Sequence, residues 1–402
     1  MTEDLHARID ATLESLAAEL VDVRRDLHRH PELAWREERT TSLIAKRMLD
    51  AGGRVRELPR SGLIVDIGPE AAEETPVVAL RADLDGLAMT DFGGTDFDST
   101  RVGVAHACGH DVHTAGLLGA GLALAQLADA GDLPHGVRLV FQPAEETMPG
   151  GALHAIESGA LEHVSRIFAL HCDPTLDVGE VGLREGPLTG AADQVVVELT
   201  GEGGHTSRPH LTQDLTYALS KVLTDLPAVL SRRLDPRAGV SLVWGLVRSG
   251  DAYNVIPSGG HLGGVLRMLD IEAWDSAEQL VREVVGQLVA PYDVRAEVIY
   301  QRGVPPVVNS AEAVAALGQA AGRVVGEDGV VLSAQSLGGE DFGWYLHHVD
   351  GAMARLGTRT PGGRTFDLHQ GDFRVDERAV SLAARLLAHV ALADLPPQAT
   401  TW

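Results

Sequence analysis

The 402-residue sequence has little of three things: cysteine, positive charge and long apolar runs. Only Cys108 and Cys172 occur, and two thiols are too few for a disulfide framework in a chain of this length. The most apolar run, 115–128, is too short to cross a bilayer. The acidic N-terminal segment lacks the apolar core of a secretory signal. We therefore expect a cytoplasmic protein that does not span a membrane.

The charge is strongly one-sided. Lys and Arg number 33 against 57 Asp and Glu, a formal net charge of −24. Such a surface repels phosphate backbones and anionic lipid, so the sequence predicts neither a nucleic-acid partner nor membrane attachment. With 45% hydrophobic and 22% charged residues, the composition is that of a globular protein, and the length favours two domains.

The first part of the chain alternates between helical and extended patterns. Apolar residues at every third or fourth position over 5–27 predict a helix that ends before Pro31. After it, predicted strands over 63–67, 77–81, 137–142 and 167–171 are interrupted by a predicted helix over 112–127. This alternation predicts an α/β catalytic domain, with a mixed, largely parallel sheet and helices on both faces.

The segment 186–300 follows a different order. Its apolar patterns predict β-α-β-β-α-β, the arrangement of a ferredoxin-like α+β domain. Beyond it the first pattern resumes, with a helix over 311–325, a strand over 352–356 and a helix over 377–392. We therefore expect a catalytic domain in two parts, 1–185 and 301–395, interrupted by an inserted domain over 186–300.

One short stretch, 106–113 (HACGHDVH), combines a cysteine, three histidines and an aspartate. Cys108 sulfur and His110 nitrogen are two residues apart on a predicted turn, and this donor pair suits zinc or another late first-row metal. A single Cys or His would more often be an ordinary core residue. Five such groups together favour a metal site.

Further polar groups follow the predicted strands. Asp83 and Asp85 follow one strand, Glu145 and Glu146 follow another, and His171 ends a third. Ligands of open α/β sheets bind at the carboxyl ends of the strands. Alone, the two glutamates would more often form a solvated acidic turn, and His171 would be a core histidine. In this context they predict metal-assisted hydrolysis, in which one carboxylate holds an ion and another takes a proton from water.

Seven motifs in order resemble the co-catalytic metallopeptidase family of aminoacylases and carboxypeptidases. The resemblance covers nearly the whole chain and is specific to the branch of hippurate hydrolases and indole-acetyl-amino-acid amidohydrolases. The motifs are 27–32 (LHRHPE), 81–87 (RADLDGL), 106–114 (HACGHDVHT), 142–146 (QPAEE), 203–210 (GGHTSRPH), 254–257 (NVIP) and 339–342 (GEDF).

The resemblance implies two divalent metal ions per subunit. Zinc or manganese is expected, with cobalt and nickel as further options. The implied ligands are Cys108, His110, Glu146, His171 and His369. Other branches have a histidine ligand at the position of Arg81, so here Cys108 and His110 have to supply ligands.

The resemblance also implies roles beyond the ligands. Glu145 matches the general base, and Asp83 matches a residue that orients the metal-binding side chains without itself binding the metal. In the inserted domain, His205 and Asn254 match residues that approach the substrate, often from the partner of a homodimer. Alternatively, His205 caps the predicted helix near Gln213.

The implied activity is hydrolysis of the amide bond of N-acyl amino acids by a metal-activated water. One alternative is a dipeptidase or carboxypeptidase of the same family. Another is a non-catalytic metal-binding or redox-sensing protein built around Cys108 and Cys172. The spare carboxylate of Glu145 argues against that last alternative, because sensing requires no base.

Overall fold

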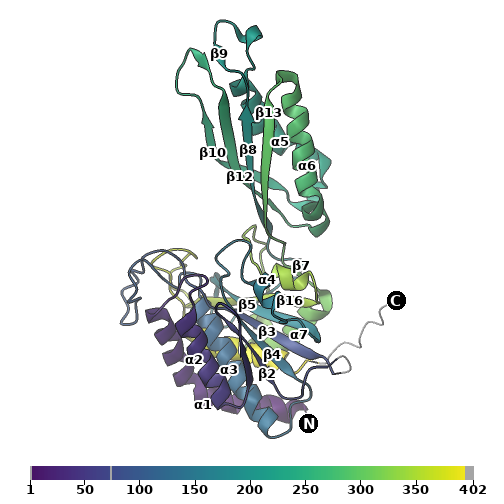
Figure 1. Ribbon diagram of the computed structural model, residues 1–402. Helices are drawn as coiled ribbons and strands as arrows, with labels where there is room; N and C mark the ends of the chain where they lie inside the picture. Colours follow the sequence, from purple (N-terminus) through teal and green to yellow (C-terminus); the bar gives the residue numbers. More distant parts are fainter. Residues whose placement is uncertain (1, 73–74, 394–402) are drawn as a thin grey trace, which may run out of the picture. The chain divides into compact units, whose positions relative to one another are not determined.

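The computed structural model describes residues 2–72 and 75–393 (Figure 1). The chain forms two compact units. The first contains residues up to Leu188, 307–334 and from Asp341 onward, and the second contains Thr189–Pro306 and Gln335–Glu340. The short segment Gln335–Glu340 had no sequence signal that assigned it to the second unit. Residues 394 and 395 of the predicted second catalytic part lie outside the described residues.

An eight-stranded sheet forms the centre of the first unit. Its order is β1-β2-β4-β3-β5-β16-β6-β15. The strands are β1 Arg54–Glu57, β2 Leu63–Ile67, β3 Val77–Asp83, β4 Val137–Gln142, β5 Val164–Asp177, β6 Val181–Leu183, β15 Val330–Leu332 and β16 Gly351–Arg359. The central strands β4, β3, β5 and β16 run parallel, whereas β1, β2 and β4 pair antiparallel. The predicted mixed, largely parallel sheet is confirmed.

Helices cover both faces of this sheet, as predicted (Figure 1). The helices are α1 Thr2–Arg29, α2 Glu38–Asp50, α3 His110–Asp129, α4 Ala152–Glu157, α7 Ala311–Val325, α8 Gly343–Leu346 and α9 Arg378–Val390. Strand β2 shows how the sheet divides the core. Leu63 and Val65 belong to the core that includes residues of α1, α2, α3, α7 and α9, whereas Ile64 belongs to the core on the other face, which includes residues of α4 and α8. Every residue of β3 and β4 is consequently buried, as expected for strands covered on both faces.

The second unit has a four-stranded antiparallel sheet in the order β10-β12-β8-β13. Its elements are β8 Ala191–Thr200, β9 Gly204–His205, α5 Leu215–Arg233, β10 Ser241–Ser249, β11 Val255–Ile256, β12 Gly259–Met268, α6 Ile271–Val289 and β13 Arg295–Val304. Leaving out the short pair β9 and β11, the order along the chain is β-α-β-β-α-β. The predicted ferredoxin-like inserted fold is confirmed.

The insertion begins and ends on a small ribbon of the first unit. There β7 (Gly186–Pro187) pairs antiparallel with β14 (Val308–Asn309). Next to this pair, the Leu188 N–H donates to the Val307 carbonyl at 2.8 Å. The buried Asn309 side chain exchanges two hydrogen bonds with the backbone of Met353 in β16. Among the described residues, no helix combines the length and apolarity needed to span a bilayer.

Candidate metal centre

Cys108 and His110 lie on the turn that starts α3. Between them, Gly109 has φ 89°, a left-handed conformation that an L side chain disfavours. A Cβ atom on Gly109 would also lie 2.7 Å from the Cys172 sulfur. Glycine therefore allows the turn to lie against β5, with the Cys108 and His110 side chains buried at the sheet edge.

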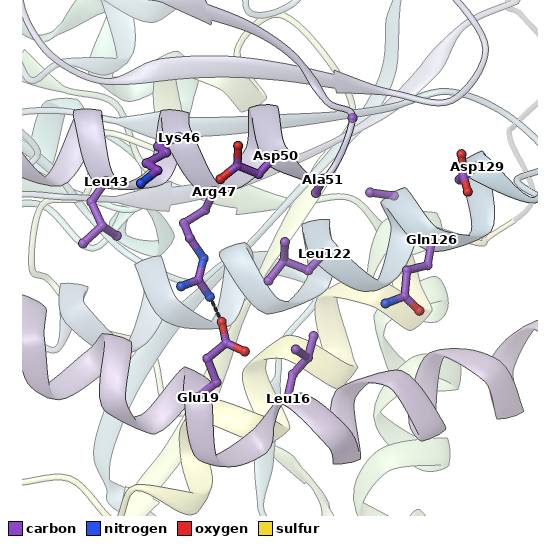
Figure 2. A pocket seen from close by; sticks show the side chains of 12 residues that line it. Leu16, Glu19, Leu43, Lys46, Arg47, Asp50, Ala51, Leu122, Gln126 and Asp129 are labelled. Carbon is purple, nitrogen blue, oxygen red and sulfur yellow. Dashed lines mark hydrogen bonds and ion pairs between the residues drawn. The ribbon is translucent and has the colours of Figure 1, made fainter.

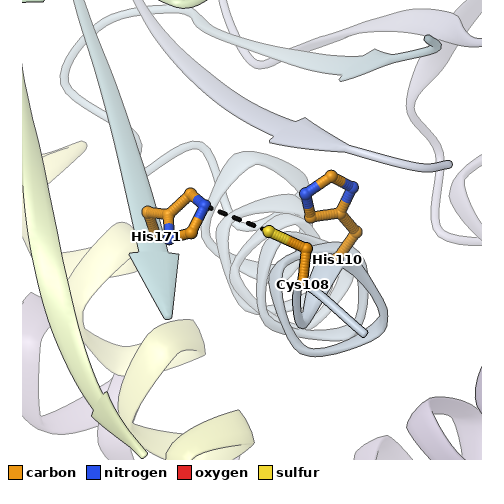
Figure 3. Close-up of side chains that lie close together, drawn as sticks. All are labelled: Cys108, His110 and His171. Atoms are coloured by element: carbon orange, nitrogen blue, oxygen red, sulfur yellow. Dashed lines mark hydrogen bonds between the residues drawn. The ribbon is translucent and has the colours of Figure 1, made fainter. Parts of the chain in front are cut away.

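Cys108, His110 and His171 lie close together in the interior (Figure 3). The Cys108 sulfur is 3.5 Å from His171 Nε2. His171 Nδ1 donates to the Cys172 carbonyl at 2.8 Å, and His110 Nδ1 donates to the Asp85 carbonyl at 2.9 Å. These bonds fix both rings so that the Nε2 atoms of His110 and His171 face the Cys108 sulfur. Metal-ligating histidines are held by the same kind of hydrogen bond from their other ring nitrogen.

Glu146 adds a carboxylate to this group. Its Oε1 atom is 3.8 Å from His110 Nε2 and 3.3 Å from His369 Nε2. Ligand atoms about 2.0–2.3 Å from a shared tetrahedral zinc lie roughly 3.3–3.8 Å from each other. His110 Nε2 is buried and has no hydrogen-bond partner among the described residues. The distances between the Glu146 oxygen and the two histidine nitrogens, together with this buried His110 Nε2 atom, fit a shared metal ion.

The donors form two trios. One is Cys108, His110 and His171, and the other is Cys108, Glu146 and His369; within each trio the donor atoms lie within 4.8 Å of one another. The two trios share the Cys108 sulfur. These five donors are the residues predicted as ligands, and their thiol, imidazole and carboxylate groups would suit two divalent ions. His369 differs from the rest because its side chain is 54% exposed.

Glu145 belongs to neither of these two trios, although its carboxylate forms a further group with His110 and Glu146 within the same 4.8 Å. Its Oε2 atom lies 3.9 Å from His110 Nε2, and its side chain is 9% exposed. The residue before it, Ala144, has φ 57°. This left-handed residue lies two residues after the end of β4 and precedes both glutamates, beside the end of β3 at Asp83. His171, predicted to end its strand, lies instead within β5, which continues to Asp177.

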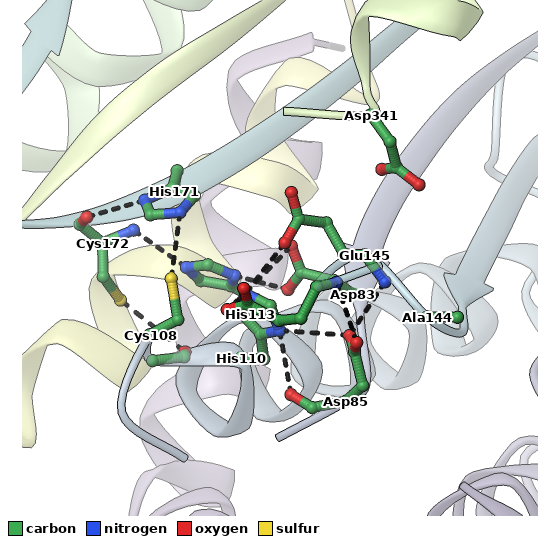
Figure 4. A network of polar contacts seen from close by, with 12 residues as sticks. Asp83, Asp85, Cys108, His110, His113, Ala144, Glu145, His171, Cys172 and Asp341 are labelled. Carbon is green, nitrogen blue, oxygen red and sulfur yellow. Dashed lines mark hydrogen bonds and ion pairs between the residues drawn. The ribbon is translucent and has the colours of Figure 1, made fainter. Parts of the chain in front are cut away.

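A second polar layer lies behind the donors (Figure 4). His113 Nδ1 donates to Asp83 at 2.6 Å, and His113 Nε2 accepts from the Cys172 N–H at 2.8 Å. Arg81 donates to both Asp83 and Asp341 at 2.7 Å. Burial alone would raise the pKa of Asp83, but His110, His113 and Arg81 outweigh it and hold that pKa well below its usual value. Asp83 is therefore ionised behind the site.

A third group of side chains anchors the start of α3 and was not predicted. Asp111 forms an ion pair with Arg24, whose Nε lies 2.7 Å from its Oδ2, and accepts a hydrogen bond from His28 Nδ1 at 2.8 Å; all three side chains are buried. Burial would raise the pKa of Asp111, but the charges on Arg24 and His28 lower it. His28 lies in the first of the seven motifs, which was the only sequence signal for this contact.

His205 and Asn254 belong to the second unit, where the fold brings them together. Strand β9 pairs with β11, and His205 lies opposite Val255, next to Asn254. The Thr206 N–H donates to the Asn254 carbonyl at 3.2 Å. The alternative in which His205 caps the following helix is wrong, because Asp214 caps α5 by accepting from the Tyr217 N–H.

A surface hollow between α1, α2 and α3 is separate from these residues (Figure 2). Its floor includes Leu16, Leu43 and Leu122, and Arg47 of α2 pairs with Glu19 of α1 across it. None of the predicted site residues lines this hollow.

A mixed sheet that, together with the start of α3, gathers thiol, imidazole and carboxylate donors beside a further glutamate defines the class of metal-dependent hydrolases with two metal positions. Residues 79–393 match the sequence profile of peptidase family M20/M25/M40. The chain belongs to this family, in agreement with the resemblance drawn from the motifs.

Individual relatives support this assignment. The chain is 36% identical over 376 residues to a Bacillus subtilis protein named N-acetyl-L-cysteine deacetylase, covering 93% of this chain and 88% of the relative. A crystal structure of a dinuclear metal-binding peptidase of the M20 family, also from Bacillus subtilis, superposes with a TM-score of 0.81 at 31% identity, covering 94% of this chain and 98% of that one.

A Rhodococcus jostii protein named "Putative glutamate--cysteine ligase 2-3" is 49% identical over 380 residues. The match covers 94% of this chain but only 47% of that relative. The chain thus spans about half of the length of this relative.

Proposed function

We propose that this protein is a metal-dependent amidohydrolase that splits N-acyl amino acids into a carboxylate and a free amino acid. Family membership and the relative named N-acetyl-L-cysteine deacetylase support this proposal. The structural observation that carries it is the sharing of Cys108 between two donor trios, with the Glu145 carboxylate beside them.

In this proposal two divalent ions are held by Cys108, His110, Glu146, His171 and His369. Thiolate sulfur favours zinc, whereas manganese, cobalt or nickel are alternatives because availability also decides occupancy. When bound, the ions supply Lewis acidity, which acidifies water and stabilises negative charge on a carbonyl oxygen.

Glu145 performs the proton transfers. Its carboxylate takes a proton from the attacking water as the new C–O bond forms, and the resulting acid gives that proton to the leaving nitrogen as the C–N bond breaks. His205 donates a hydrogen bond to the oxyanion of the intermediate, and Asn254 contributes to binding of the substrate beside it. Asp83 orients the donors from behind through His113.

A substrate panel tests the activity. We expect the metal-loaded protein to hydrolyse N-acetyl, N-benzoyl or N-indoleacetyl amino acids, with N-acetyl-L-cysteine the first to be tried. Chelation should abolish turnover, and added zinc or manganese should restore it. Hydrolysis of dipeptides alone would make the protein a dipeptidase or carboxypeptidase. Stoichiometric metal binding without turnover of either class would instead favour a non-catalytic metal protein.

The proposal includes a homodimer formed through the inserted domain. Among the described strands, β10 is an edge of the four-stranded sheet, and its Val243 and Val247 side chains are 65% and 51% exposed. An exposed edge with apolar side chains favours pairing with a second copy. Such a dimer provides a way for His205 to act at the partner's metal centre.

Mixing two inactive variants tests that arrangement. If His205 acts across the dimer, combining His205→Ala subunits with Glu145→Gln subunits creates one site with both groups intact, and activity should reappear. No recovery among subunits that demonstrably exchange would show that His205 does not act across the dimer. A cytoplasmic location is also part of the proposal, supported by the two cysteines, which are both free thiols.

A further inference from the structure

Three consecutive backbone N–H groups on the loop after β4 donate to two carboxylates, of which Figure 4 shows Asp85. The Ala144 N–H donates to Glu37 Oε1 at 2.8 Å. The Glu145 and Glu146 N–H groups donate to Asp85 Oδ1 and Oδ2 at 3.0 and 2.9 Å. The residues held in this way are the proposed base, the proposed ligand and the residue that turns the chain toward them.

Both carboxylates are buried and come from other parts of the sequence. Glu37 has no exposed surface and precedes α2, whereas Asp85 is 1% exposed and lies two residues after β3. The second oxygen of Glu37 accepts from the Ser61 hydroxyl at 2.6 Å. All four carboxylate oxygens therefore have a hydrogen-bond donor, and three of the four donors are N–H groups of one loop.

The loop needs such support because of its backbone. Ala144 has φ 57°, a left-handed conformation that a non-glycine residue disfavours. Successive N–H groups around a left-handed residue form a concave surface that attracts anions. Here oxygens of the Glu37 and Asp85 side chains accept these N–H groups, so the left-handed turn and its acceptors stabilise each other.

We propose that Glu37 and Asp85 are positioning residues, which hold the backbone of residues 144–146 and thereby set where Glu145 meets the reacting water. Glu37 acts through the loop. Asp85 acts through the loop and also lies beside the proposed ligand His110, whose Nδ1 is 3.4 Å from Asp85 Oδ1. Neither residue is assigned contact with substrate. This inference rests on the proposed function, because Glu145 has a catalytic task only if the protein is a hydrolase.

The hydrogen-bond pattern predicts different tolerance to amide substitution at the two positions. Asp85 accepts two N–H groups, one on each oxygen, and an asparagine there would turn an NH₂ group against one of them. Glu37 accepts one N–H and one hydroxyl. The Ser61 hydroxyl can accept as well as donate, so glutamine at position 37 can satisfy both partners.

The test compares Asp85→Asn, Glu37→Ala and Glu37→Gln with Glu38→Ala, a change at the neighbouring exposed glutamate. We expect Asp85→Asn and Glu37→Ala to lower kcat by roughly 10- to 100-fold, the size of effect caused by misplacing a catalytic group by about 1 Å. KM should change less than kcat. Glu37→Gln should recover most of the activity that Glu37→Ala loses, and Glu38→Ala should behave like the wild type.

Amide hydrogen exchange gives a readout that does not depend on activity. In metal-free protein, a peptide containing residues 143–147 should exchange faster in Asp85→Asn and Glu37→Ala, but not in Glu37→Gln, because lost hydrogen bonds expose the amides. Unchanged exchange in Asp85→Asn, or equal losses for Glu37→Gln and Glu37→Ala, would overturn the proposal. If the wild type hydrolyses no amide, the proposed function fails, whereas the exchange pattern still decides whether the two carboxylates hold the loop.

Discussion

Glu145 and Glu146 are neighbours in sequence but differ in their surroundings. Glu146 Oε1 faces two histidine nitrogens at 3.3 and 3.8 Å, whereas the Glu145 carboxylate stands 3.9 Å from one of them. Glu145→Gln keeps the shape but cannot take a proton, so turnover should fall roughly 100- to 10,000-fold with metal retained. Glu146→Gln should lose metal instead. Metal analysis and kinetics check both, and equal metal content with equal activity would contradict the assignment.

Cys108 leads to a prediction about metal removal. Burial raises the pKa of its thiol, although His110 opposes this effect. The metal-free thiol is therefore protonated, and binding an ion to the thiolate must release a proton. Metal affinity should fall as pH falls, and metal should protect Cys108 from alkylation as measured by mass spectrometry. Cys172 is fully buried and should label slowly in both states, so equal labelling of Cys108 with and without metal would exclude it as a ligand.

Glu37 makes stability depend on pH. Burial raises its pKa from 4.5 to about 7, against the hydrogen bond from Ser61. Between these values the folded state holds a proton that the unfolded state has lost, so the free energy of unfolding falls as pH rises. Glu37→Gln cannot ionise and should gain up to about 3 kcal/mol relative to the wild type between pH 4.5 and 7.5. Urea unfolding of metal-free protein measures this, and a pH-independent difference would contradict it.

Sequence reasoning identified the donor residues but not how they are held. Cys108 and His110 are conspicuous because a thiol and three imidazoles in one short stretch have few other uses, and His171 is conspicuous because it follows an apolar run. Asp85 holds residues 145 and 146 by accepting hydrogen bonds from their backbone N–H groups. Because every residue except proline has such a group, these bonds leave no recognisable pattern in the sequence. The contact between His28 and Asp111 joins residues 83 positions apart, so only the folded chain reveals it.

Among the elements, the first turn of α3 is most sensitive to change. Gly109→Ala would place a Cβ 2.7 Å from the Cys172 sulfur in a backbone conformation with φ 89°. We expect a loss of about 1–3 kcal/mol in stability, together with weaker metal binding because Cys108 and His110 flank this residue. Thermal unfolding and metal titration test both effects. Gly131→Ala, where a left-handed glycine has open space around it, is the control for strain alone.

Long periodic elements were predicted well and short ones were not. The helical pattern over 5–27 corresponds to α1 (Thr2–Arg29), and the strand predicted over 137–142 is β4. Strands β6 and β15 have three residues each, too few for a recognisable pattern, and they exist because β16 and β6 offer pairing edges. Helix α2 was missed, although five of its residues are buried.

At the scale of the whole molecule, all five proposed ligands belong to the first unit. A ligand stabilises only the folded unit that binds it. Calorimetry should therefore show that chelation lowers the unfolding temperature of the first unit and leaves that of the second unit unchanged. Added zinc should return the unfolding temperature of the first unit to its original value. An equal shift of both transitions would show instead that the two units unfold together.

The ribbon of β7 and β14 also affects how the inserted domain can vary in evolution. It joins residues 186–187 to 308–309, and the bond from Leu188 to Val307 closes the same point. To the catalytic sheet, the intervening segment is a loop with adjacent fixed ends, and the entropy of such a loop changes only slowly with its length. The inserted domain can consequently lengthen, shorten or be exchanged for another at little thermodynamic cost to its host. The proposed role of His205 limits this freedom to changes that keep β9 and its histidine in place.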